Sequence, residues 1–463
     1  MGHTKSKTWK PNSLSYSLLY SLPDEILLNI LSFLPMEERC NMARVCRRFN
    51  ALVRDRALWH TIDVVQVIER HFERMIADPL MLMFDRYHPL QMKYCLLWFL
   101  NAYAKNAERL CLTTASRSVL SYVHDNCRNI KDFHVREYAP STRRLMTALK
   151  HLPSDIHTLK IEFPRKFDVL LCDKESNGFV ACPLDHLTEL TLQGAAIDVS
   201  FCNNIAQLPR LGRLRLLWCT MSKHLTLRNC QFLNMIKCLE ICCCLFVSFN
   251  RLLIFLVEIA QYGTNLITFH FQMPNAENNL LKVDLGKIKS RYRHMLYLSS
   301  IDIDPFIYEL CQTKSAVKLR NLYFRGNFTL SGPALDTLTQ RFDSIEGLSL
   351  GDNLLGCMLL TIAKNLRKLK VIDLCKGRFS DSWLHCFQNH PCLQAIRVYQ
   401  STRLSCHELC EIIRTLPSMT LLCTTQHEQL KDLRTKNPRI LICHSYCQWV
   451  RLLDKYVHNE GVS

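Results

Sequence analysis

Glycine and proline are scarce in this sequence, at 13 and 16 of 463 residues, and no stretch is rich in Gly or Ser. Long flexible linkers between domains are therefore not expected. Hydrophobic residues make up 48% of the chain and charged residues 21%, which indicates a folded protein and not a disordered tail. The length fits two or three ordinary domains, or one small domain and a long repeat array.

Motifs of several enzyme classes are also missing. The chain has no Gly-x-x-x-x-Gly-Lys-[Ser/Thr] phosphate loop, no His-Glu-x-x-His zinc motif and no Gly-x-Ser-x-Gly nucleophile elbow. The nearest approach to a set of metal ligands is two Cys pairs, each four residues apart: Cys406 with Cys410 and Cys443 with Cys447. Zinc sites usually use tighter Cys-x-x-Cys turns. We therefore expect no catalytic residue, no metal site and no cofactor.

No uninterrupted apolar run is long enough to cross a membrane. The most apolar stretch, residues 241–260, contains Asn250, Arg251 and Glu258. Charged residues inside a membrane span are costly, so a buried strand followed by a buried helix is expected there instead.

Cysteine, in contrast, is abundant, with 24 residues. Disulfide scaffolds are typical of short secreted chains, whereas this chain is long and shows no convincing signal peptide. The cysteines are therefore interpreted as reduced and mostly buried, in a cytoplasmic or nuclear protein. The formal net charge of +17 favours acidic partners, which include acidic proteins, nucleic acid and anionic membrane surfaces.

The most specific pattern lies in residues 21–59. Ser21 can cap a helix, Pro23 suits the first helical turn, and Asp24 and Glu25 suit the positive end of the helix dipole. Apolar residues then follow at helical spacing, and Pro35 ends the helix. That apolar stripe consists of Ile26, Leu27, Ile30, Leu31 and Leu34.

Two further short elements follow in the same region. Glu37 and Glu38 occupy the first turn of a second expected helix, whose apolar face has helical spacing. The apolar residues of that face are Met42, Val45, Cys46 and Phe49, and those of the third element are Leu52, Val53, Leu58 and Trp59. Amphipathicity alone would also suit an ordinary helical subdomain whose stripe is its own core.

The order of these residues resembles an F-box, the helical module that docks proteins onto a Skp-type adaptor in SCF ubiquitin ligases. The matching segments are Leu22-Pro23-Asp24-Glu25, Leu31-Ser32-Phe33-Leu34-Pro35, Val45-Cys46-Arg47-Arg48 and Leu58-Trp59. The resemblance implies that the adaptor is contacted by Leu22, Pro23, Ile26, Leu27, Ile30, Leu31, Leu34, Pro35, Val45 and Cys46. Trp59 is expected to pack the module together.

A second pattern, an apolar motif of the form Leu-x-x-Leu-x-Leu, recurs from residue 107 to the C-terminus at intervals of 23 to 31 residues. This period and motif are those of leucine-rich repeats. A generic α/β domain with coincidental leucines is the alternative. The central residues of the motifs are Leu110, Phe133, Leu159, Leu190, Leu214, Leu239, Phe269, Leu298, Leu322, Leu348, Ile372, Ile396 and Leu422.

The expected fold class is therefore α/β: a small all-helical F-box followed by a leucine-rich-repeat solenoid. One strand with one helix cannot bury its own apolar face, so the copies stack with a curved parallel sheet inside and helices outside. Three residues after the last strand leucine, several copies have the Cys or Asn that bonds the backbone between repeats. These residues are Cys219, Cys244, Asn327 and Asn353.

The expected order of domains follows from both resemblances. Between the two modules, apolar periodicity predicts helices near residues 64–84 and 90–105, which would join the F-box rigidly to the first repeat. The chain then divides into a disordered basic N-terminus at 1–18, the F-box at 19–61, a helical connector at 62–106, the solenoid at 107–450 and a tail at 451–463.

Side chains that flank the central residue of each motif are expected on the concave face of the solenoid. Arginine and tyrosine are prominent at energetically important interface positions. Our candidate target-binding residues are therefore Arg213, Arg215, Tyr323, Arg325, Arg397 and Tyr399. Acidic residues are expected on the same face, so the net charge is not concentrated there: Asp132, Glu162, Glu189, Glu240 and Asp373.

The combined resemblance implies the substrate-recognition subunit of an SCF-type ubiquitin ligase. The F-box would dock on the Skp adaptor, and through it on a cullin, while the repeats bind a protein target. The chain itself would act by proximity. Two alternatives stay open: a repeat scaffold whose F-box assembles a complex without ubiquitin transfer, and a basic-surface binder of nucleic acid or membranes.

Overall fold

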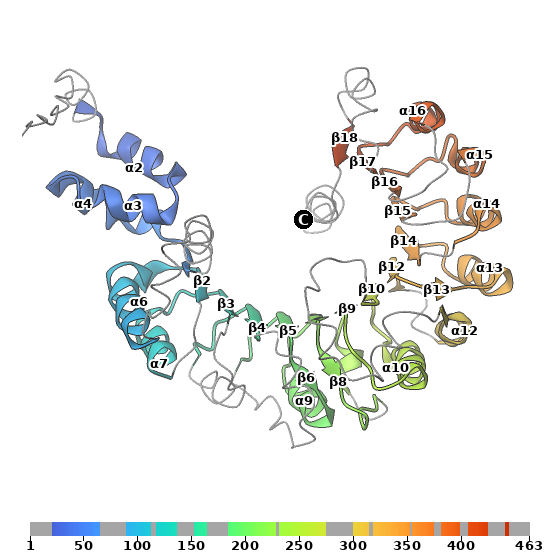
Figure 1. Cartoon of the computed structure of the whole chain (residues 1–463), viewed down its shortest axis with the longest axis horizontal. Helices are drawn as coiled ribbons and strands as arrows, with labels where there is room; N and C mark the ends of the chain where they lie inside the picture. The colour runs from blue at the N-terminus through green and yellow to red at the C-terminus, as the bar shows by residue number, and fades with distance from the viewer. Residues whose placement is uncertain are drawn as a thin grey trace, which may run out of the picture. The chain divides into compact units, whose positions relative to one another are not determined.

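The computed structural model describes residues 21–64, 89–112, 117–136, 152–163, 184–227, 231–274, 300–313, 318–351, 354–374, 381–398, 406–424 and 440–443. The chain divides into two compact units, residues 1–160 with 182–184, and residues 161–181 with 185–463. The elements of each unit are shown in Figure 1. No helix in the described ranges is both long and apolar enough to cross a membrane.

The first unit begins with a short helical bundle and continues into parallel strands. Its helices are α2 (Asp24–Phe33), α3 (Met36–Met42), α4 (Arg47–Val53), η1 (Arg56–Leu58), α6 (Pro89–Tyr103), η3 (Ala104–Asn106) and α7 (Arg117–Asn126). Its strands are β1 (Thr61–Asp63), β2 (Arg109–Leu112), β3 (Asp132–Arg136) and the start of β4 (Thr158–Glu162). The helix expected near residues 90–105 is confirmed by α6, and the one near 64–84 lies outside the described residues.

The ends of the bundle helices differ from the expectation in two places. Helix α2 is preceded by Pro23 and has no side-chain cap, so the expected role of Ser21 as a cap is wrong, while Asp24 and Glu25 do occupy its first turn. The expected second helix is divided in two. The Cys46 thiol accepts a hydrogen bond from the backbone N–H of Phe49 and so caps α4, the second of the two helices.

The second unit contains strands that run parallel and follow one another in chain order. They are β5 (Glu189–Gln193), β7 (Arg213–Leu217), β9 (Cys238–Cys242), β10 (Thr268–Gln272), β12 (Asn321–Arg325), β14 (Gly347–Leu350), β15 (Val371–Asp373), β16 (Ala395–Val398), β17 (Leu421–Thr424) and β18 (Leu441–Cys443). Two small sheets pair β6 (Ala196–Ile197) with β8 (Thr220–Met221), and β11 (Ile301–Asp302) with β13 (Phe328–Thr329).

Helices connect successive strands of the second unit. They are α9 (Val199–Ile205), η6 (Gln231–Asn234), α10 (Phe249–Tyr262), α12 (Asp304–Gln312), α13 (Gly332–Arg341), α14 (Gly356–Asn365), α15 (Asp381–Leu384), η8 (His385–Phe387) and α16 (Cys406–Thr415). Helices α10 and α12 to α16 line one side of strands β10 to β18 (Figure 1). The expected solenoid architecture, with a parallel sheet on one side and helices on the other, is confirmed. We call the sheet face that points away from these helices the inner face.

The motif spacing predicts the strand register correctly. In the second unit the central motif residues lie opposite one another from strand to strand, and all of them are buried. This row consists of Leu190, Leu214, Leu239, Phe269, Leu322, Leu348, Ile372, Ile396 and Leu422. The motif at Leu298 lies outside the described residues, and β10 pairs directly with β12 rather than with a strand between them.

Two strands lie beyond the motifs that the sequence indicates. Ile62 of β1 pairs opposite Leu110, and Ile442 of β18 pairs opposite Leu422. Both strands have only three residues, so their apolar alternation is too short to stand out in the sequence.

The expected cysteine bonds between repeats are present at two positions. The Cys219 thiol donates to the carbonyl oxygen of Leu192 at 3.5 Å, and the Cys244 thiol donates to that of Leu216 at 3.3 Å. Both cysteines are buried. Asn327 is exposed, so its expected inward role is wrong. Asn353 lies outside the described residues.

The backbone turns through the left-handed region just after several strands. Gly194, Trp218, Cys243 and Gly326 occupy equivalent places, four residues after the central motif residue, with φ of 76°, 54°, 57° and 114°. A Cβ on Gly326 would come within 2.9 Å of the Met273 Cβ, so this turn requires glycine both for its φ and for space.

Candidate interaction surfaces

One surface lies on the F-box-like bundle of the first unit. Ile26, Ile30 and Phe33 follow one another along α2 at spacings of four and three residues, and their exposed fractions are 46%, 43% and 82%. Val45, between α3 and α4, is 59% exposed. Large apolar side chains grouped on a surface indicate an interaction site. We call the three α2 residues the exposed apolar patch, and Val45 is a further exposed apolar residue of the bundle.

Two residues expected to contact an adaptor belong instead to the core of the bundle. Leu27 and Leu31 are each 1% exposed, so in this structure neither presents its side chain to a partner. The stripe that the sequence shows on α2 therefore divides between two faces, one turned to the core and one to solvent. Phe33 is not among the residues expected to contact the adaptor, although its distance of seven residues from Ile26 places it on the exposed face.

The other expected adaptor residues lie at the surface to varying degrees. Pro23, Pro35 and Val45 are exposed, whereas Leu22, Leu34 and Cys46 are half-buried. The backbone of Leu22 is anchored by Arg48, whose Nη2 donates a hydrogen bond to the Leu22 carbonyl oxygen at 2.6 Å. Their contact with an adaptor stays a prediction.

Arg39 of α3 organises the bundle. Its guanidinium donates to the carbonyl oxygens of Leu31 at 3.1 Å, Ser32 at 2.8 Å and Leu34 at 2.9 Å. A helix leaves its last carbonyl groups without partners, and Arg39 supplies partners to the end of α2. The guanidinium also bonds the Leu58 carbonyl oxygen and lies 5.9 Å from the centre of the Trp59 ring. One side chain therefore joins α2, α3 and η1.

Trp59 joins the bundle to the first strands. Its ring stacks on Tyr103 of α6, with 4.4 Å between ring centroids, and it is 1% exposed. The backbone carbonyl oxygen of the next residue, His60, accepts hydrogen bonds from the N–H groups of Glu108 and Arg109, both at 2.9 Å. Strand β1 starts at Thr61 and pairs with β2. No linker therefore separates the bundle from the first strands.

A second surface is the inner face of the second unit, and its two halves differ. On β5, β7 and β9, polar inner-face residues are partly exposed and form ion pairs. Arg213 Nη1 lies 3.4 Å from Glu189 Oε1, and Arg215 Nε lies 2.9 Å from Glu240 Oε1. Arg213 and Arg215 were expected on this face, and they lie there with acidic neighbours. The open half is thus of mixed charge.

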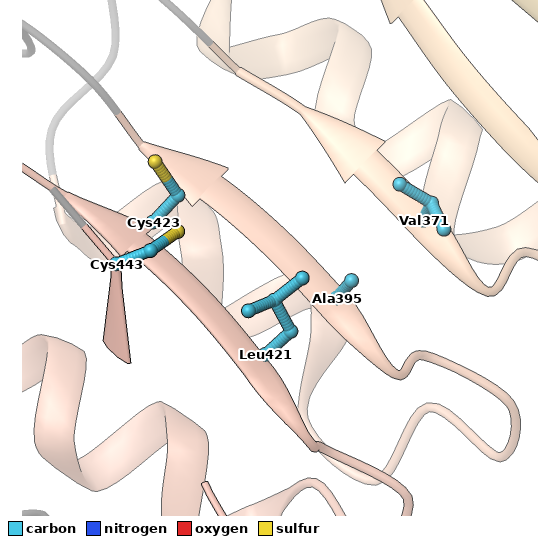
Figure 2. Packing of buried hydrophobic residues seen from close by; sticks show 5 residues of the cluster. All are labelled: Val371, Ala395, Leu421, Cys423 and Cys443. Atoms are coloured by element: carbon cyan, nitrogen blue, oxygen red, sulfur yellow. The ribbon is translucent and has the colours of Figure 1, made fainter. Parts of the chain in front are cut away.

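From β12 to β18 most inner-face residues are buried, and they include both apolar and charged side chains. Val371, Ala395 and Leu421 lie opposite one another and are at most 1% exposed. Cys423 and Cys443 continue the same buried cluster (Figure 2). This half of the inner face does not offer the exposed surface that strand alternation alone suggests.

Three residues expected to bind a target are located in the buried half. Tyr323 is 7% exposed and Arg397 is 6% exposed. Arg325 and Arg397 both pair with the fully buried Asp373, at 2.9 Å from Oδ2 in each case. Their expected role as an exposed arginine and tyrosine patch is therefore corrected to an internal charged network. Tyr399 lies outside the described residues.

Small residues on β14 make this network possible. A Cβ on Gly347 would lie 2.0 Å from the Tyr323 hydroxyl oxygen, so the Tyr323 side chain extends over Gly347. Next along the strand, Ser349 bonds the Phe324 carbonyl oxygen at 3.0 Å. Because β14 carries no bulky inner-face side chain here, Arg325 of β12 can reach across it to Asp373 of β15.

His270 lies on the inner face of β10, opposite Glu240 on one side and Tyr323 on the other. Its Nδ1 lies 3.8 Å from the Cys242 thiol, and its Nε2 is buried with no hydrogen-bond partner among the described residues. Burial, and then the positive charges of Arg325 and Arg215, hold the pKa of His270 well below its usual value. The ring is therefore neutral at physiological pH.

The described residues contain no group of three or more His, Cys, Asp or Glu side chains that could hold a metal ion. Of the two Cys pairs noted in the sequence, Cys447 is outside the described ranges. Cys410 lies on α16 and is half-buried.

Comparison with known proteins finds a family model and several relatives that this chain resembles. Residues 19–64 match the family model described as F-box-like. F-box/LRR-repeat protein 12 of Mus musculus is 27% identical over 233 residues, 45% of this chain and 67% of the mouse protein. The Homo sapiens protein of that name is 33% identical over 114 residues, 22% of this chain and 35% of the human protein.

The protein of the same name from Bos taurus is 32% identical over 111 residues, 21% of this chain and 34% of the bovine protein. The matched regions therefore span about a third of the human and bovine relatives. Together with the strand register, these matches confirm the expected resemblance to proteins that combine an F-box with leucine-rich repeats.

Proposed function

We propose that this chain, which matches the F-box-like family model and resembles F-box/LRR-repeat proteins, is a substrate-recognition subunit of an SCF-type ubiquitin ligase. Its F-box-like bundle would bind a Skp-type adaptor, and through it a cullin. Its repeats would bind a protein target in the cytoplasm or the nucleus. The observation that carries the proposal is the exposed apolar patch of Ile26, Ile30 and Phe33, with Val45 also exposed, on a domain that matches the F-box-like family.

The patch is suited to protein binding because it is not needed for folding. The bundle already has its own core, formed by residues such as Leu27, Leu31, Val53 and Trp59, which are at most 1% exposed. Burying the large side chains of the patch against a partner would remove substantial apolar area from water, at about 25 cal/mol per Å². A surface of this kind is retained where a partner covers it.

The direct joining of bundle and strands supports action by proximity. Trp59 and β1 fix the bundle to the first strands without a flexible link. This joint would orient a bound adaptor relative to the first strands, and an adaptor and a target held on one chain have a raised effective concentration toward each other. In this proposal the chain contributes positioning, and the chemistry of ubiquitin transfer takes place on other subunits.

The target would bind the open half of the inner face. Arg213 and Arg215 lie there with side chains 41% and 32% exposed, beside Glu189 and Glu240. Such a surface of both charge signs favours a partner with complementary charges over a uniformly anionic one. Nucleic acid is therefore a less suitable partner for this face than a protein.

Co-purification with the Skp adaptor and cullin tests the proposal. The variant combines Ile30→Glu and Phe33→Glu, which place charges in the patch without touching the core. The matched control is Leu360→Glu on α14, where an apolar side chain is 52% exposed on the second unit. We expect wild type and control to retain the adaptor and the double variant to lose it.

Two other results would change the conclusion. If wild type captures no adaptor, the proposed function is wrong. If it captures adaptor and cullin yet supports no ubiquitin transfer to any protein bound to the repeats, the chain is a scaffold that assembles a complex. Unchanged helical circular dichroism in the double variant would show that loss of binding is not loss of folding.

A further inference from the structure

Cys423 of β17 and Cys443 of β18 lie directly opposite each other in parallel pairing. Both are buried, at 0% and 2% exposed, and both are free thiols. Figure 2 shows the two side chains next to each other on neighbouring strands, in the same buried cluster as Val371, Ala395 and Leu421. The described part of the chain thus has a dithiol on its inner face.

The backbone spacing at this position suits a disulfide. Neighbouring strands lie about 4.8 Å apart, and Cα atoms joined by a disulfide are usually about 4.4 to 6.8 Å apart. Register partners in a parallel pair also project their side chains to the same face. The two sulfur atoms can therefore bond without a change of strand register.

Arg397 makes the two thiols chemically unequal. It is the register partner of Cys423 on β16, and it is anchored to Asp373 at 2.9 Å. A hydrogen bond from the Cys443 thiol, together with Arg397, lowers the pKa of Cys423, although burial opposes the shift. The same hydrogen bond and burial raise the pKa of Cys443. Cys423 is thus the better nucleophile, and Cys443 keeps its proton.

We propose that Cys423 and Cys443 form a reversible oxidation site that a peroxide converts into a cross-strand disulfide. The Cys423 thiolate attacks hydrogen peroxide, the O–O bond breaks, and hydroxide leaves to give a sulfenic acid. The Cys443 thiol then attacks that sulfur, an S–S bond replaces the S–O bond, and water leaves. In total two thiols and one peroxide give one disulfide and two water molecules.

The position of β18 provides a route for the oxidant. Strand β18 is the last in the sheet order, pairs with β17 alone among the described strands, and has only three residues. Leu441, two residues before Cys443, is partly exposed. Short elements at an edge open locally at a lower free energy than the rest of a fold, and hydrogen peroxide is small. The disulfide would then fasten this edge strand to β17.

A second thiol pair in the chain serves as the matched control. Cys219 and Cys244 are also buried and interact with each other. Their thiols donate to backbone carbonyl groups, and burial and the Cys219 thiol hold the pKa of Cys244 well above its usual value. This pair should resist a peroxide dose that oxidises Cys423 and Cys443.

The test is peptide mapping by mass spectrometry of the full-length reduced protein after treatment with hydrogen peroxide and blocking of the remaining thiols. We expect a linked peptide that joins Cys423 to Cys443, two hydrogens lighter than the separate peptides and reversed by dithiothreitol. Cys219 and Cys244 should stay reduced. Absence of the Cys423–Cys443 link in wild type, or equal oxidation of both pairs, would overturn the proposal.

Two variants separate the roles of the residues. In Cys443→Ser the reaction should stop at the Cys423 sulfenic acid, which a dimedone probe detects by mass. Arg397→Gln removes a positive charge that lowers the pKa of Cys423, so the thiolate fraction and the rate of the first step should both fall. An unchanged rate in a folded Arg397→Gln protein, or no dimedone adduct in folded Cys443→Ser, would contradict the proposed order of events.

Discussion

Arg397 of β16 donates to both carboxylate oxygens of Asp373 on the neighbouring strand β15, at 2.9 and 3.2 Å, and the Asp373 side chain has no exposure to solvent. Arg325 reaches the same carboxylate from β12. Two guanidinium groups and one carboxylate thus link β12, β15 and β16 on the inner face. A buried charge is tolerated only when it is paired, so these three side chains depend on one another.

Asp373→Asn should be strongly destabilising, because it leaves two buried guanidinium groups without their shared carboxylate. We expect a loss of about 3 to 5 kcal/mol, the usual cost of removing one partner from a buried pair. Glu189→Gln, which breaks the partly exposed pair with Arg213, should cost less than about 1 kcal/mol. Urea denaturation of the two variants measures both values. Similar losses would mean that Asp373 is far better solvated than its burial indicates.

Leu31→Ala and Phe33→Ala should separate the folding role of α2 from its binding role. Leu31 is buried, and its truncation should cost about 2 to 5 kcal/mol and lower the melting temperature of the first unit. Phe33 is 82% exposed, so its truncation should leave stability nearly unchanged and weaken adaptor binding. Calorimetry and co-purification on the same two proteins provide the comparison. A strongly destabilised Phe33→Ala protein would contradict the assigned faces of α2.

Gly326→Ala should destabilise the second unit by about 1 to 3 kcal/mol, since the residue has a φ of 114° and its added Cβ would press against Met273. Gly212→Ala is the matched control, because nothing lies within 4 Å of its added Cβ and its φ is not in the left-handed region. Thermal unfolding of the two variants distinguishes them, and equal melting temperatures would refute the steric account of the turn.

Stability should fall as pH decreases below about 6.5, in part because of His270. Its pKa in the folded state is well below its unfolded value. At pH 7.5 the ring is neutral in both states, whereas below the unfolded pKa of about 6.5 only the unfolded chain takes up the proton. Protonation therefore favours unfolding, and the contribution of His270 to stability is lost progressively as the pH falls below 6.5.

His270→Gln should remove that contribution and reduce the difference between urea midpoints measured at pH 7.5 and pH 5.5. His390 would remain in the variant, and burial also lowers the pKa of that residue, so part of the pH dependence should persist. An identical pH dependence in wild type and variant would mean that His270 is accessible to protons in the folded state.

The sequence predicts the repeat strands well because the spacing of their motifs follows from the packing of the core. Each motif leucine must face the same core, so the spacing from Leu190 to Leu422 also determines which residues lie opposite one another. Alternation likewise predicts that Arg325 and Arg397 share a face with Asp373. It does not predict whether that face is open, and burial of the β12 to β18 half follows from tertiary packing.

In the bundle, too, some features can be predicted from the sequence and others depend on tertiary packing. Its helical periodicity and acidic first turns are readable in the sequence, and the Leu-Pro-Asp-Glu start is specific. The role of Arg39 is not readable, because its carbonyl partners on α2 and η1 come together only in the folded chain. The division of the α2 stripe between Leu31 and Ile30 also depends on where the neighbouring helices pack.

Strand β1 limits where the chain can be divided into stable fragments. Because it pairs with β2 and directly follows Trp59, the bundle protects one border of the sheet in the first unit. A fragment that starts after residue 64 would present β2 with unpaired backbone N–H and C=O groups along that border, and would lose the ring stacked on Tyr103. Unprotected strand borders pair with other chains. Isolated repeats prepared in this way should self-associate more strongly than the chain that retains the bundle.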